Sequence, residues 1–328
     1  MFKNKKKCSI LALLSLFLWG ITFYTDTRLF SSDGLNMNCL PIDTAAVPFM
    51  HIMTKFFVLA AIFLFLYFIT YAYNKPFLIF PVILFFVLYM VGLLLSYPGY
   101  FMNDDPIIFS YATRYYPVYW HNYLTSLFYM VGMSLIPASC GPIILSDLLF
   151  ALTYGYITYE THKLFTTRLH YIILILGILP CTLLAALMPF RPCLYTSFHL
   201  FFFAWLTFQY LKKITPSFPK LIGLAFLSAL LAFWRSEGII LLVFAPILLI
   251  LVFGKEIHKG QVITFLIAML AFFTIIKIPQ SLGESKYYGS DYLIISTTRP
   301  LSVIVHRDQT YNGAAEDLTN INAVTDFG

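Results

Sequence analysis

The sequence predicts an all-α fold, a polytopic bundle of membrane-spanning helices. Of its 328 residues, 60% are hydrophobic and only 11% are charged, and the mean hydropathy is +0.81. Soluble domains carry about 25% charged residues, so this composition excludes an ordinary soluble domain. The cations lie in short clusters between apolar runs, which is typical of membrane topology and not of nucleic-acid binding. The five cysteines are scattered, with no metal-binding or disulfide spacing.

About nine transmembrane helices are predicted. A bilayer core of about 30 Å needs about 20 apolar residues per helix. The predicted spans are 8–24, 51–72, 77–97, 142–159, 169–189, 194–211, 221–234, 239–253 and 261–278. The runs 221–234 and 239–253 are short and must borrow residues from their flanks.

The first span follows four lysines, Lys3, Lys5, Lys6 and Lys7, and so resembles a signal peptide. No pair of small residues follows it as a cleavage site, and we interpret it as an uncleaved helix. With a cytoplasmic N-terminus, the cytoplasmic turns hold most cations, in agreement with the positive-inside rule. These are Lys75, Lys163, Arg168, Lys212, Lys213, Lys220, Lys255 and Lys259.

A long loop, about residues 98–141, then falls on the outer side. It is rich in aromatic residues and contains the apolar segment Tyr123 to Ile136, which is too short to cross comfortably. We predict that this segment is a helix lying in the outer interface. Residues 1–278 form the predicted transmembrane domain. Residues 279–328 form an extracytoplasmic tail, either small or the start of an outer domain that the chain does not complete.

Asp104 and Asp105 are the first candidate site residues, because adjacent carboxylates beside a membrane exit are costly. One interpretation is a solvated pair that caps a helix beginning at Pro106. The other is catalysis, with Asp104 as a general base and Asp105 as the cap or a secondary ligand of a divalent cation.

Four further candidates share the outer side. His121 is either an interfacial residue or faces the same cavity as Asp104, where it contacts a phosphate or a sugar hydroxyl. Arg191 and Arg235 stand in two short turns where they could bind phosphate, and Glu237 follows Arg235. The Arg235 and Glu237 side chains could instead form a weak exposed pair. Asp147 is expected to pair with one of the arginines.

Several short segments resemble the GT-C-type membrane glycosyltransferases, the superfamily of protein O-mannosyltransferases and aminoarabinose transferases, and bacterial members most closely. Pro98-Gly99 followed by Asp104 matches the loop aspartate element, and Trp120-His121 matches the aromatic-histidine pair. Arg235-Ser236-Glu237-Gly238 matches a late turn, and residues 296–326 resemble a tail segment. Asn122 follows His121 where proline is frequent in the family.

The resemblance implies sugar transfer at the outer face of a bacterial cytoplasmic membrane. The donor would be a polyprenyl-phosphate sugar and the partners membrane lipid and lipid-linked sugar. Asp104 would act as the base, or with Asp105 hold a divalent cation, and Arg191 and Arg235 would bind the departing phosphate. His121 and Glu237 would complete the substrate site. The resemblance leaves open whether the chain is complete or C-terminally truncated and inactive.

Three other functions compete with sugar transfer. A flippase or transporter of lipid-linked saccharides predicts ionisable residues near the bilayer midplane. A polysaccharide polymerase shares the outer-face site but tends to place its large loop late in the chain. A non-catalytic scaffold predicts that Asp104→Asn changes nothing.

Overall fold

The computed structural model describes residues 5–29, 46–102, 104–165 and 168–287, and these residues are helical with short connections and no strand. The chain divides into two units, residues 1–277 and 278–328, and the following concerns the first. The predicted all-helical class is confirmed. Most of the predicted tail lies outside the described residues.

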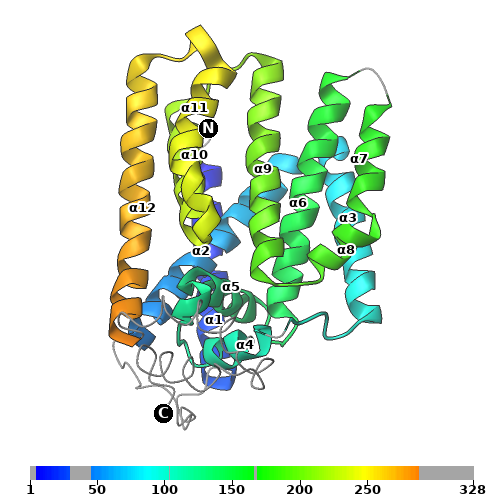
Figure 1. The fold of residues 1–328 in the computed structure, drawn as a ribbon. Coiled ribbons are helices and arrows are strands. Elements are labelled where there is room, and N and C mark those ends of the chain that lie inside the picture. The colour runs from blue at the N-terminus through cyan, green and yellow to red at the C-terminus, as the bar shows by residue number, and fades with distance from the viewer. Residues whose placement is uncertain (1–4, 30–45, 103, 166–167, 288–328) are drawn as a thin grey trace, which may run out of the picture. The chain divides into compact units, whose positions relative to one another are not determined.

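The apolar runs of the sequence form helices (Figure 1), and one run forms two. The long helices are α1 (Lys5–Leu29), α2 (Ala46–Ala72), α3 (Pro76–Leu95), α6 (Gly141–Leu164), α9 (Arg191–Lys212), α10 (Phe218–Trp234), α11 (Leu241–Phe253) and α12 (Lys259–Tyr287). A 3₁₀ turn, η2 (Ser236–Ile240), precedes α11, and η3 (Gly254–Glu256) follows it. The last helix continues to Tyr287, beyond residue 278 where the sequence pattern ended the final span.

Several helices are long and apolar enough to cross a membrane. Among the residues that the structure describes, five segments qualify by length and composition, namely α2, α3, α6, residues 236–253 and residues 259–286. The apolar part of α1 and the whole of α10 are shorter apolar helices. These features fit an integral membrane protein, and the count of nine crossings stays a prediction.

The predicted span 169–189 is broken in two. Its parts are α7 (Leu169–Gly177) and α8 (Pro180–Ala186), bent by 56°. Pro180 has no N–H to continue the ladder, and its ring disfavours helical geometry at the residue before it, so the helix stops there. Counted as one bent span, this pair would raise the number of crossing segments to six.

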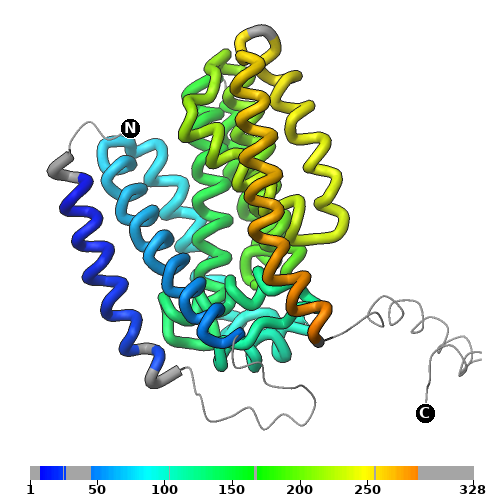
Figure 2. Tube along the Cα trace, turned by 90° about the vertical axis from the view of Figure 1, so that its left-hand side faces the viewer, coloured from blue at the N-terminus to red at the C-terminus, as the bar shows by residue number. Residues whose placement is uncertain are grey.

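The loop helices gather at one end of the bundle, which we call the loop end. They are α4 (Asp105–Ala112), η1 (Tyr119–His121) and α5 (Tyr123–Leu135). Figure 1 shows α4 and α5 where α3 ends and α6 begins. In Figure 2, α1 runs beside α2 and reaches the same end. Nearly all of α5 is buried within the protein, so this helix is more enclosed than an interfacial helix needs to be.

The crossing of α3 and α6 is close because α6 carries a glycine there. A Cβ on Gly155 would lie 2.2 Å from Cγ2 and 3.1 Å from the backbone nitrogen of Val82. Around the crossing, Phe85 and Tyr89 of α3 pack on Phe150 and Ala151 of α6. Packing of helices in membranes depends on such small residues, since lipid is as apolar as the side chains.

We predict that Gly155→Ala lowers the thermal unfolding midpoint in detergent, because the added methyl group pushes α3 away from α6. Overpacking of this kind costs about 1–3 kcal/mol. The matched control is Gly223→Ala in α10, where a Cβ would meet nothing within 4 Å. Equal midpoints for the two variants would contradict the close crossing.

Candidate functional site at the loop end

A tight turn after α3 leads the chain to the two aspartates. Gly99 has φ +110°, and a Cβ there would lie 2.2 Å from Cδ1 of Ile143. Glycine is the residue that tolerates both this backbone conformation and this contact. The Tyr100 N–H then bonds to the Leu187 carbonyl at 3.3 Å. The turn fixes where the chain enters the segment that leads to Asp104.

The structure separates the two aspartates. Asp104 precedes α4 and its side chain is 45% exposed. Asp105 is the first residue of α4 and is fully buried. Its Oδ2 accepts a hydrogen bond of 2.7 Å from the Met102 N–H. The capping expectation is therefore wrong in detail: Asp105 lies inside the helix, and the Asp104 side chain makes no capping hydrogen bond.

His121 lies directly behind Asp104. Its Nε2 is 3.0 Å from Asp104 Oδ2, and its side chain is 6% exposed. The His121 carbonyl accepts a 3.2 Å hydrogen bond from Arg191 at the start of α9. The structure thus brings together four predicted residues, Asp104, Asp105, His121 and Arg191. The buried ring of His121 supports Asp104 from within, while the carboxylate faces outward.

Burial controls the charges of this group. It lowers the pKa of His121; the hydrogen bond with Asp104 opposes this, and the charge of Arg191 adds to the lowering. Burial likewise raises the pKa of Asp105, although the Met102 N–H and the nearby Tyr129 hydroxyl act to lower this pKa. A neutral imidazole beside an ionised carboxylate carries its proton on the nitrogen that faces it. His121 therefore donates through Nε2 and holds Asp104 in one orientation.

Asn122, directly after His121, fastens the loop to its surroundings. Its Oδ1 accepts from the Leu124 N–H at 3.1 Å and caps α5, and its Nδ2 donates to the Phe233 carbonyl at 3.1 Å. The Trp234 indole also donates to Thr125 at 3.1 Å. Asn122 itself has φ +70°, in the left-handed region that asparagine tolerates better than most residues. Through these hydrogen bonds, the end of α10 is joined to the loop that carries His121.

Arg235 and Glu237 form their own pair. Two hydrogen bonds of 2.9 and 3.2 Å join the guanidinium to the carboxylate. Arg235 lowers the pKa of the exposed Glu237 to about 2. Arg235 also lies 5.7 Å from the ring of Tyr195, which is one turn from Arg191 on α9. Among the described residues, no hydrogen bond joins this pair to Asp104, so the two groups are neighbours and not one cluster.

Asp147 is not paired with an arginine. It is fully buried in α6, and neither carboxylate oxygen has a hydrogen-bond partner within the described residues. The expected pairing with Arg191 or Arg235 is wrong. A buried carboxyl group without a partner is costly.

Sequence reasoning missed a second polar cluster at the loop end. It joins Asp26 of α1 to His51 and Lys55 of α2 and to Tyr115, between α4 and η1. The available signal was Lys55, a lysine within an otherwise apolar predicted span. Such a residue predicts a partner at the same depth.

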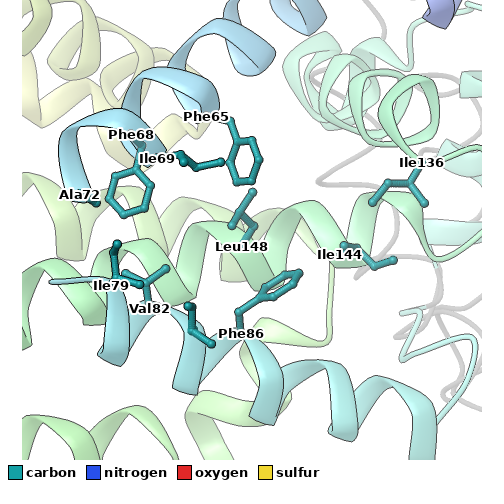
Figure 3. A pocket seen from close by; sticks show the side chains of 11 residues that line it. Phe65, Phe68, Ile69, Ala72, Ile79, Val82, Phe86, Ile136, Ile144 and Leu148 are labelled. Carbon is teal, nitrogen blue, oxygen red and sulfur yellow. The ribbon is translucent and has the colours of Figure 1, made fainter. Parts of the chain in front are cut away.

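An apolar cavity of about 490 Å³ lies between α2, α3 and α6. Figure 3 shows its lining, which includes Phe65, Phe86, Ile136, Ile144 and Leu148. The lining offers no polar group for chemistry, and its composition suits a hydrocarbon chain.

Within the described parts of the chain, no three His, Cys, Asp or Glu residues are grouped as a metal site. A divalent cation held by Asp104 and Asp105 together with substrate oxygens stays a prediction. Comparison with protein-family models, curated proteins and solved structures finds no match to this chain. The geometry of the loop end therefore carries the functional argument.

We predict that acidification weakens the fold through His121. The folded protein binds the proton less readily than the unfolded chain, so stability falls as the pH decreases below the ordinary value of about 6.5. Each unit by which the pKa is lowered corresponds to about 1.4 kcal/mol. The thermal midpoint should fall less for His121→Gln than for the unaltered protein between about pH 7 and pH 5. An equal fall in both would show that His121 is not the group responsible.

Proposed function

We propose that the protein is a membrane glycosyltransferase of GT-C type, which moves a sugar from a polyprenyl-phosphate donor to an acceptor at the outer face of the membrane. One observation carries the proposal: an exposed carboxylate, Asp104, is oriented by the buried His121, whose own backbone is held by Arg191. Such a group has the position of a general base, with a permanent cation close by.

The reaction would use these side chains directly. Asp104 accepts the proton of the acceptor hydroxyl, and the hydroxyl oxygen attacks the anomeric carbon of the sugar. The bond from that carbon to the phosphate oxygen breaks, and its electrons remain on the phosphate. Arg191 supplies positive charge where this negative charge develops, which lowers the barrier electrostatically.

Arg235 has a supporting role. Its partner Glu237 is exposed, and an exposed ion pair contributes little to stability. A phosphate can therefore replace Glu237 on the guanidinium at small cost, and Arg binds phosphate through two parallel hydrogen bonds. The apolar cavity between α2, α3 and α6 offers space for lipid hydrocarbon.

We also propose nine crossings, made by α1, α2, α3, α6, α7 with α8, α9, α10, α11 and α12. The N-terminus is then cytoplasmic and the loop end faces outward. The lysine-rich turns fall on the cytoplasmic side, in accordance with the positive-inside rule. In this arrangement α4 and α5 lie at the outer interface, at the depth of a donor headgroup.

One observation favours a transporter as the second candidate. Asp147 is a buried carboxyl group without a hydrogen-bond partner among the described residues, in a helix long enough to cross the membrane. Ionisable residues inside a membrane often mark ion or substrate pathways. The main proposal assigns Asp147 no part in sugar transfer, so the two functions differ in which aspartate they need.

We predict that Asp104→Asn lowers the rate of sugar transfer by about 10²–10⁴-fold, because an amide cannot accept the proton. The assay follows a radiolabelled sugar from polyprenyl phosphate to membrane acceptors. Asp147→Asn is the matched control and should keep the rate. Normal transfer by Asp104→Asn would remove the base assignment, and dependence of lipid-linked sugar translocation on Asp147 would favour the transporter.

The topology has its own test. In a variant with the native cysteines replaced, Glu237→Cys should react with an impermeant thiol reagent from the outer side, because Glu237 is exposed at the loop end. Lys163→Cys, at the opposite end of α6, should react only after the membrane is opened. Labelling in the reverse pattern would invert the topology and place the carboxylates in the cytoplasm.

A further inference from the structure

The polar cluster on α1 and α2 is built around Asp26. Its Oδ1 accepts hydrogen bonds of 2.7 Å from both Lys55 Nζ and the Tyr115 hydroxyl. Its Oδ2 lies 3.0 Å from His51 Nε2. The ring of His51 packs edge-on against Tyr115, with centroids 4.7 Å apart. One carboxylate therefore joins two helices to the loop that carries His121.

The cluster is a defined structure and not a loose surface pair. The Lys55 side chain is 5% exposed, and its ammonium group donates to the Thr22 carbonyl at 2.9 Å as well as to Asp26. A buried ammonium group needs a charge and acceptors close by. The Tyr115 hydroxyl and the His51 ring complete the set of partners around the Asp26 carboxylate.

Tyr115 is the link between this cluster and the candidate site. It stands in the short connection from α4, whose start carries the aspartates, to η1, which ends at His121. Its φ is +54°, a left-handed conformation that costs a bulky residue energy. The hydrogen bond to Asp26 and the packing on His51 hold the side chain there. Because Tyr115 lies between Asp104 and His121 in the chain, its movement would change the position of the His121 ring relative to the Asp104 carboxylate.

We propose that Asp26 is a positioning residue, which acts through Tyr115 to hold His121 against Asp104. Lys55 and His51 fix the Asp26 carboxylate in the required place. The catalytic meaning of this arrangement rests on the proposed glycosyltransferase function, while the positioning itself does not. Helices α1 and α2, which carry none of the residues predicted as a site, are then part of its machinery.

The test is the titration of the His121 ring, followed by NMR of ring-labelled histidines and assigned by the signal that His121→Gln removes. The titratable and charged groups that act on this ring are Asp104 and Asp105 of the α4 region and Arg191 of α9. Tyr115→Phe removes the hydrogen bond to Asp26 but leaves the Lys55 ion pair. Because burial is the largest influence on the ring, a loosened loop should shift the His121 midpoint upward.

A matched control is Tyr73→Phe, which changes the same group on a side chain that is 77% exposed at the other end of α2. It should leave the midpoint unchanged. If Tyr115→Phe also leaves the His121 midpoint unchanged, Asp26 does not position the pair and the proposal is wrong.

A second variant approaches the link from the other side. Asp26→Leu combined with Lys55→Met removes both charges, so neither is left buried alone, and such exchanges are often neutral for folding. Tyr115 keeps its hydroxyl but loses its carboxylate partner, and the same upward shift is expected. A shift in both variants, with no sugar transfer by the unaltered protein, would contradict the proposed function alone. Transfer with no shift would contradict the positioning alone.

Discussion

In a chain with so few charged residues, an ionised side chain can be buried among the helices only where another part of the protein offers it an opposite charge or a hydrogen bond. The ion pairs of the described residues obey this constraint and stand near the ends of the bundle. Lys212 pairs with Glu160 at one end, and Asp26, Asp104 and Arg235 find partners at the loop end. Polar contacts made by Tyr115, His121 and Asn122 fasten the segment between α3 and α6 to the helix ends.

The start of α4 places two adjacent aspartates in different environments. Asp105 turns inward, loses contact with solvent and uses one oxygen on a backbone N–H. Asp104 stays accessible and is supported from behind by the ring of His121, whose pKa is lowered by burial. Chemistry at a membrane surface needs an accessible base that is also rigid. A buried histidine meets both needs, because it orients the carboxylate without covering it.

The apolar runs predicted the helices well, because a long run of apolar residues is visible in the local sequence. Asp104, His121 and Arg191 could also be chosen as one group, because the predicted topology places all three on one side. Contacts between distant segments could not be read in the same way. Nothing in the local sequence indicates that Asn122 contacts Phe233, that Asp26 contacts Tyr115, or that Asp147 has no hydrogen-bond partner among the described residues. The break before Pro180 could have been predicted from that proline, and Lys55 from the apolar span around it.

The burial of Lys55 has a consequence for how the protein is made. A lysine at the centre of a membrane helix opposes insertion of that helix by about 2.5–3.5 kcal/mol. Lys55 lies nearer one end of α2, and the group that neutralises it, Asp26, belongs to the helix synthesised just before. If α1 and α2 cross the bilayer as proposed, their entry as a hairpin would let the two charges meet before either is surrounded by lipid. The carboxylate of α1 would then neutralise Lys55 of α2 during insertion, and separating the two helices would leave the lysine without its counter-ion.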